Sequence, residues 1–199
     1  MIDGLAPIHF FRLHIDIPEG KPRSHLPNNT DLLGEDHFAD CALSWSESGL
    51  HAGLHVHKQF ESAVYPKFTQ GDALELFIDT RDLKEAGFPT RFCHHFLILP
   101  QEVQGVRALE LTRLRTDDAH PLCDPELIEV KFLPTSHSYE LEIFLPTEIL
   151  FGYDPLQFNQ LGFTYTVHRA GGPPQNFALS STYVSIAQNP SLWASCTLK

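Results

Sequence analysis

Apolar and polar residues alternate in short runs along most of the chain, and the clearest run is segment 71–81. One face of this run would carry Leu74, Leu76 and Ile78, and the other face Glu75, Phe77 and Asp79. A period of two is the pattern of a β-strand that buries one face. Carboxylates on the second face need a partner, water or a ligand, so this strand is also a candidate for chemistry.

Similar runs predict eight to ten short strands and almost no helix. The predicted strands cover residues 8–17, 39–45, 50–57, 73–79, 92–99, 109–114, 128–133, 138–145, 161–168 and 192–194, and a short helix is expected at 146–150. Residues 46–49 supply a turn between the second and third of these strands, which predicts a hairpin. Many short strands at regular spacing predict an all-β antiparallel sandwich or a closed barrel.

Composition narrows the class of protein. The 199 residues suit a single domain spanning 1–199, and 42% hydrophobic residues are enough for a sizeable core. The net charge of −11 repels nucleic acid and anionic lipid, and no apolar run approaches the roughly 20 residues of a membrane span. We therefore expect neither nucleic acid nor a membrane as a partner. The pattern does not predict an oligomeric state.

The four cysteines are widely spaced, which favours buried free thiols over a disulfide scaffold. The N-terminus has no basic region followed by an apolar run, so it does not resemble a secretion signal. The expected location is therefore the cytoplasm, or outside the cell if a signal was trimmed.

Five segments match, in order, motifs of a known family. They are the Trp45–Val56 hairpin, Gly71–Asp79 (pattern G-D-x-x-E-L-F-I-D), Tyr139–Pro146, Leu161–Val167 (pattern L-G-F-x-x-x-V) and Pro190–Leu198 (pattern P-x-x-W). With these motifs, residues 44–198 resemble the family 9 carbohydrate-binding modules and the wider group of DOMON-like domains. The resemblance implies a jelly-roll-like antiparallel β-sandwich that binds a sugar and performs no catalysis.

The resemblance also implies which residues form the site. Typical members hold a sugar ring between two tryptophans, because sugar rings have apolar C–H faces and hydroxyl rims. Trp193 matches one of these positions, and Phe68 followed by Thr69 stands where the second tryptophan precedes the Gly-Asp motif. The expected hydroxyl ligands are Glu75, His168 and Asn189. Relatives contain structural calcium, for which the acidic loops at 79–82 and 117–118 are candidates.

The histidines raise a second hypothesis. His55 and His57 would point to the same face of a strand and, with Glu61, reproduce the spacing of the first metal-binding motif of cupins. This hypothesis predicts a metal-dependent enzyme. Otherwise no catalytic motif is present, and we expect a binding domain rather than an enzyme.

A third hypothesis is an interaction domain that kept the sandwich and lost the sugar site, as the missing second tryptophan suggests. On this view Trp193 is a core residue, and Glu75 is a structural carboxylate paired to Arg81, Arg91 or a strand-edge amide. Asp79 is expected to cap a turn. Glu140 and Glu142 are expected on a solvated face of the sheet.

Overall fold

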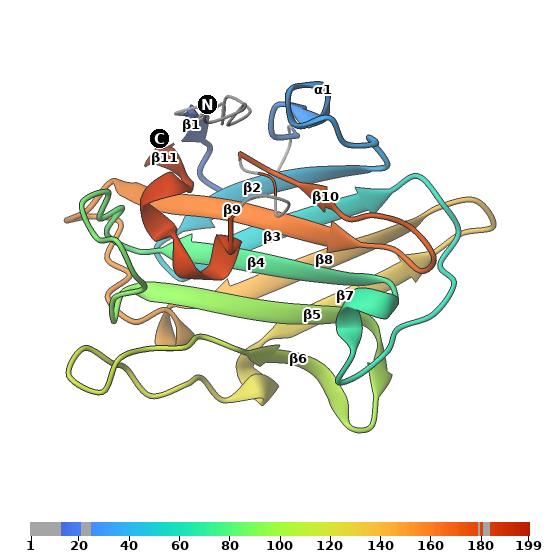
Figure 1. The fold of residues 1–199 in the computed structure, drawn as a ribbon. Coiled ribbons are helices and arrows are strands. Elements are labelled where there is room, and N and C mark those ends of the chain that lie inside the picture. The colour runs from blue at the N-terminus through green and yellow to red at the C-terminus, as the bar shows by residue number, and fades with distance from the viewer. Residues whose placement is uncertain (1–12, 21–24, 179, 181–183) are drawn as a thin grey trace, which may run out of the picture.

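The computed structural model describes residues 13–20, 25–178, 180 and 184–199, and within them the chain forms two packed sheets (Figure 1). The larger sheet contains β1 (His14–Ile17), β4 (Ala73–Asp79), β5 (Cys93–Val103), β6 (Val106–Glu110), β9 (Gln160–His168), β10 (Gln175–Asn176) and β11 (Ala194–Leu198). The smaller sheet contains β2 (Ala39–Ser46), β3 (Gly49–Val56), β7 (Glu129–Pro134) and β8 (Tyr139–Pro146). The architecture is the predicted all-β sandwich.

The strand order explains how distant segments meet. In the larger sheet the order is β1-β11-β9-β4-β5-β6, and β10 pairs with the end of β9. In the smaller sheet the order is β2-β3-β8-β7. Within the described residues, the pairings between these named strands are antiparallel except the one between β1 and β11.

The main core lies between the two sheets and follows from the alternation in the sequence. On β4 the inward residues Leu74, Leu76 and Ile78 are fully buried. On β8 the buried Leu141 and Ile143 alternate with Glu140 and Glu142, which are exposed as predicted. Among the described residues, no helix is both long and apolar enough to cross a membrane.

Helices are short throughout the described residues. They are α1 (Thr30–Leu33) and 3₁₀ turns at Phe68–Gln70, Pro125–Leu127, Thr147–Ile149, Ile186–Gln188 and Pro190–Leu192. The helix expected at 146–150 is thus a single 3₁₀ turn. Neither α1 nor the two-residue strand β10 was predicted, because both are too short to give a periodic pattern.

Several predicted strand boundaries differ from the structure, most of them by one residue. The larger differences concern β1, β5, β6 and β11. The strand expected at 92–99 is β5, which continues through Pro100 to Val103. The strand expected at 8–17 is seen only as β1, because residues 8–12 lie outside the described residues. The strand expected at 109–114 is β6, which ends at Glu110 because the Thr112 hydroxyl, rather than a backbone carbonyl, accepts from the His95 N–H at 2.8 Å. The last strand begins at Ala194 instead of Leu192, since residues 190–192 form a 3₁₀ turn that starts at Pro190.

Candidate functional site

The outer face of the larger sheet carries a carboxylate between two apolar clusters. Successive outward residues of β4 are Ala73, Glu75 and Phe77, because alternate residues of a strand face the same side. Ala73 packs in a cluster that residues of segment 63–68 cover. Phe77 packs in a second cluster, covered by residues of segment 184–193. The apolar cover on each side leaves Glu75 as the polar centre of this face.

Two histidines from the neighbouring strands bind Glu75. His95 of β5 donates through Nε2 to one carboxylate oxygen at 2.6 Å, and His168 of β9 donates through Nε2 to the other at 2.7 Å. Neither histidine lies directly opposite Glu75, since the Cα partner of His95 is Phe77 and that of His168 is Ala73. The contacts are therefore diagonal cross-strand pairs, which only the register of three strands creates.

This arrangement keeps Glu75 ionised. Burial by itself raises the pKa of a carboxyl group, and the side chain of Glu75 is only 12% exposed. The hydrogen bonds from His168 and His95, together with the charges of these rings, outweigh burial and lower the pKa to about 2. At neutral pH the site thus holds a carboxylate that is oriented by two imidazole N–H groups.

A cavity of about 440 Å³ opens next to this centre. It is lined by Phe68, Pro89, Cys93, His94, His95, Leu111, Thr112, Arg113, Ser185, Ala187, Gln188 and Trp193. The two predicted aromatic residues, Phe68 and Trp193, thus line one cavity together with His95. Glu75 is connected to the cavity through its hydrogen bond to His95.

Trp193 lies at the edge of this cavity but is almost fully covered. It is 3% exposed, its ring centroid lies 5.8 Å from that of Phe77, and its indole N–H donates to the carbonyl oxygen of Ile186 at 2.9 Å. Phe77 in turn stacks on His95, with 4.3 Å between ring centroids. An aromatic stack therefore connects Trp193 to the histidine that holds Glu75.

The other predicted site residues lie on the same face. The ring of Phe68 is half-buried and makes an edge contact with His168 at 5.8 Å between centroids. Asn189 belongs to the covering segment, where its side-chain amide donates to the carbonyl oxygen of Ser185 at 2.8 Å. It does not line the cavity, whereas its neighbour Gln188 does.

The sequence did not identify the polar residues that line the cavity. They are His94, His95, Thr112, Arg113, Ser185 and Gln188. His94 and His95 are adjacent on β5, so their side chains point to opposite faces: His94 contacts the buried Glu110 and His95 contacts Glu75. Nothing local indicates that His95 faces β4, because this neighbour is set by strand order. The pairings of Glu75 expected with Arg81 or Arg91 are not formed; histidines take both oxygens.

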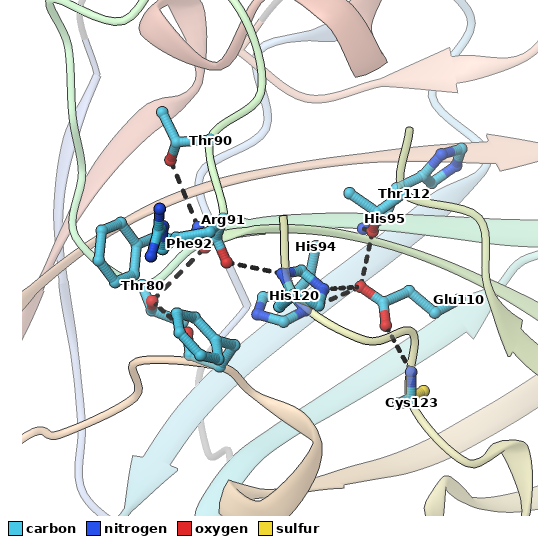
Figure 2. Close-up of polar contacts among 11 residues, drawn as sticks. Thr80, Thr90, Arg91, Phe92, His94, His95, Glu110, Thr112, His120 and Cys123 are labelled. Carbon is cyan, nitrogen blue, oxygen red and sulfur yellow. Dashed lines mark hydrogen bonds and ion pairs between the residues drawn. The ribbon is translucent and has the colours of Figure 1, made fainter. Parts of the chain in front are cut away.

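A buried polar network is centred on Glu110, the last residue of β6 (Figure 2). Glu110 accepts hydrogen bonds on one oxygen from Nδ1 of His94 and Nε2 of His120, both at 2.9 Å, and from the Thr112 hydroxyl at 2.6 Å. Its second oxygen accepts from the backbone N–H of Cys123 at 2.8 Å. The network ties β5 and β6 to the loop at 120–123, next to the cavity.

Both ring nitrogens of His120 act as donors in this network. Nε2 donates to the Glu110 carboxylate, and Nδ1 donates to the carbonyl oxygen of Arg91 at 2.6 Å. Burial by itself lowers the pKa of His120, but the hydrogen bond to Glu110 and the charge of Glu110 outweigh it and raise the pKa. Burial alone would raise the pKa of Glu110, whereas the hydrogen bonds from His120 and His94 bring it well below its ordinary range. This is a structural ion pair.

The residues predicted to bind metal ions are only partly brought together. His55 and His57 lie close to each other, but Glu61 forms an ion pair with Lys58 at 3.0 Å, and Asp40 takes its place beside the histidines. In the loop proposed for calcium, the Asp79 carboxylate caps the turn by accepting from the backbone N–H groups of Arg81 and Leu83.

The second loop proposed for calcium is also engaged in a protein contact. Asp118 pairs with Arg91 at 2.5 Å. Calcium at either loop stays a prediction. All four cysteines are free, and Cys41, Cys93 and Cys196 are buried, as the spacing predicted.

Comparison with known proteins identifies the fold. No protein-family model and no curated protein matches the chain. Among solved structures, the family 9 carbohydrate-binding module of Caldicellulosiruptor kristjanssonii in complex with cellotriose matches with a TM-score of 0.65 and 17% identity, covering 94% of this chain and 93% of that one. The glucose complex from the same organism matches with a TM-score of 0.66 and 16% identity, covering 94% and 95%. The chain therefore has the fold of the family 9 carbohydrate-binding modules.

Proposed function

We propose that the protein is a non-catalytic binding domain that recognises a carbohydrate on the outer face of the larger sheet. The observation that carries the proposal is the cavity that Phe68, Trp193 and His95 line together. The Glu75 carboxylate lies beside it and holds His95 and His168. A sugar needs an apolar surface for its C–H face and charged or polar acceptors for its hydroxyl groups, and this face offers both.

The residues have distinct roles in this proposal. Phe68 provides the accessible aromatic surface, because it is only half-buried. His95, Arg113 and Gln188 supply hydrogen-bonding groups at the cavity wall. Glu75 fixes the orientation of His95 and His168, while Trp193 supports the aromatic stack from behind. The size of the cavity, about 440 Å³, suits a small saccharide or the end of a chain.

The structural neighbours support this proposal at the level of ligand class. Two structures with the same fold contain cellotriose and glucose. At 16–17% identity the likeness extends to the fold alone, so the sugar has to be identified by experiment.

An interaction domain without sugar recognition is the second candidate. The burial of Trp193 favours it, since an indole that is 3% exposed, with its N–H bonded to Ile186, offers little surface to a ligand. The two candidates differ in whether any saccharide binds and in whether binding depends on Phe68.

Titration calorimetry with glucose, cellobiose and cellotriose, extended by a glycan array, tests the proposal. We expect binding that Phe68→Ala weakens at least about ten-fold and that Phe144→Ala leaves unchanged. Phe144 is the matched control because it is an aromatic residue that stacks on His51 on the smaller sheet, away from this face. Binding that is indifferent to Phe68→Ala, or no binding on the array, would reject the proposed site and support the second candidate.

Intrinsic fluorescence gives an independent signal. Trp45 and Trp193 are the two tryptophans of the chain, so Trp45→Phe leaves Trp193 as the single reporter. We expect a saccharide that enters the cavity to shift the emission of Trp193. A saccharide that binds without affecting this emission would bind elsewhere.

A further inference from the structure

We propose that Asp40, His37, His55 and His57 form a binding site for a divalent transition metal ion of the zinc class. The proposal concerns the smaller sheet and is independent of the proposed sugar site on the larger one. It rests on the position of four potential ligands and on their partial exposure to solvent.

The strand register brings three of the ligands together. Asp40 on β2 is the direct cross-strand partner of His55 on β3. His57 directly follows β3, and the contact of its Nε2 with the Asp40 carboxylate places it on the same side as His55. Since the inward residues of this hairpin, such as Cys41 and Leu54, fill the core, these polar side chains lie on the outer face. One potential ligand atom from each of Asp40, His55 and His57 lies within 4.8 Å of the others.

His37, from the segment that precedes β2, is a fourth potential ligand beside this group. Its Nε2 lies 3.0 Å from one carboxylate oxygen of Asp40, and Nε2 of His57 lies 2.8 Å from the other. The centroids of the His55 and His57 rings are 4.9 Å apart, and those of His37 and His57 are 5.5 Å apart. Two imidazoles and the Asp40 carboxylate therefore share a small volume, and the third imidazole, that of His37, contacts this group through Asp40.

The spacing of the donor atoms suits a metal ion. Zinc binds imidazole nitrogen and carboxylate oxygen at about 2.0–2.2 Å, so neighbouring ligand atoms in a tetrahedral site lie roughly 3.3 Å apart. The hydrogen-bonded pairs around Asp40 are at 2.8 and 3.0 Å. Small rotations of these side chains would admit an ion between them. Imidazole and carboxylate ligands favour zinc, nickel, copper or cobalt over calcium.

Charge and exposure also favour a cation. Among the described residues, Asp40 forms ion pairs only with histidines. They are His37, His57 and, at 3.9 Å, His25. The side chains of His37 and His57 are 31% and 40% exposed, so an ion can enter without unfolding. The buried cluster of His94, Glu110 and His120 differs, because both His120 nitrogens already donate to protein oxygens.

Titration calorimetry of the untagged full chain, first treated with EDTA, tests this site with ZnCl₂. Cobalt is the spectroscopic probe, since tetrahedral Co²⁺ absorbs in the visible range. We expect one equivalent of Zn²⁺ to bind and to raise the melting temperature, because an ion that binds only the folded state stabilises it. Asp40→Asn and His57→Ala should each weaken binding at least about ten-fold.

His51→Ala is the matched control. His51 lies on β3 and faces the same side as His55, but it lies outside the cluster. We expect His51→Ala to leave zinc binding unchanged. The absence of stoichiometric Zn²⁺ or Co²⁺ binding, or binding that survives in the His55→Ala/His57→Ala double variant, would overturn the proposal. Far-ultraviolet circular dichroism of each variant separates loss of the site from loss of the fold.

Discussion

Nε2 of His168 donates a hydrogen bond to Glu75 at 2.7 Å, although 93 residues separate the two side chains in the sequence. β9 lies beside β4 in the larger sheet, so a residue near the end of one strand reaches the middle of the other. With His95 from the other neighbour, this pair makes Glu75 the electrostatic centre of the outer face. The stability of the fold, and the way this stability changes with pH, should therefore depend on Glu75.

Replacement of Glu75 by alanine should destabilise the fold. The change leaves the N–H groups of His95 and His168 without their acceptor in a largely buried position, at a cost of about 1–3 kcal/mol in the free energy of unfolding. Urea denaturation at pH 7 measures the difference. Glu140→Ala is the control, because Glu140 is an exposed strand carboxylate, and its effect should stay below about 0.5 kcal/mol. Equal effects of the two changes would contradict the proposed role of Glu75.

Acid should remove the contribution of Glu75 to the free energy of unfolding within a defined pH range. A carboxylate whose pKa falls from about 4.5 to about 2 on folding stabilises the protein fully above pH 4.5, and this contribution is lost as the pH falls towards 2. At about 1.4 kcal/mol per pH unit the upper limit is about 3 kcal/mol. The stability difference between wild type and Glu75→Gln, measured by urea denaturation, should therefore shrink between pH 4.5 and pH 2. A difference that is constant over this range would show that the carboxylate is not responsible.

Trp193 should behave as a core residue as well as a wall of the cavity. It packs with Phe77, Cys93 and Ile186, so Trp193→Ala is expected to lower the free energy of unfolding by about 3–5 kcal/mol. Trp193→Phe should cost less because it retains most of the packing. Thermal and urea denaturation measure both changes. A loss below about 1 kcal/mol for Trp193→Ala would instead indicate an exposed aromatic platform.

The Glu110 network should make a large contribution to stability. Glu110→Gln removes the charge that pairs with His120 inside the protein, and breaking a buried pair costs about 3–5 kcal/mol. Since the pKa of His120 is raised, its contribution is present below the ordinary value of about 6.5 and is lost as the pH rises through the raised pKa. The free energy of unfolding of the wild type, measured by urea denaturation, should thus decline as the pH rises through the raised pKa of His120. This decline should be absent in His120→Ala.

Glu126→Gln is the control for that comparison. Glu126 is an exposed carboxylate in the turn at Pro125–Leu127, and its replacement should change stability by less than about 0.5 kcal/mol. If Glu110→Gln has an equally small effect in urea denaturation, the buried ion pair is not a stabilising element.

Local patterns in the sequence determined the fold class and most of the strands. Alternation on 73–79 and 138–145 placed the correct residues in the core, because side chains on a strand alternate between its two faces whatever the neighbours are. Elements too short to show a periodic pattern of apolar residues, such as α1 and β10, were not predicted. The sandwich inferred from the motifs in 44–198 is the fold observed.

The contacts among the candidate site residues could not be predicted from the sequence, for a physical reason. The sequence identified Glu75, Phe68, Trp193 and His168 as candidates, but strand order alone decides that His95 and His168 flank Glu75. In the same way, the pattern of His55 and His57 predicted a shared face, whereas the register of the β2–β3 hairpin selects Asp40 as their neighbour instead of Glu61.

The sequence by itself determined which side chains face inward and outward on each strand, since this depends only on the two-residue period. Tertiary structure decided which outward side chains meet, because hydrogen bonding between distant strands sets their order and register. Glu75 is the clearest case: its strand position was fixed locally, while its histidine partners and its low pKa arise only when β5 and β9 pair with β4.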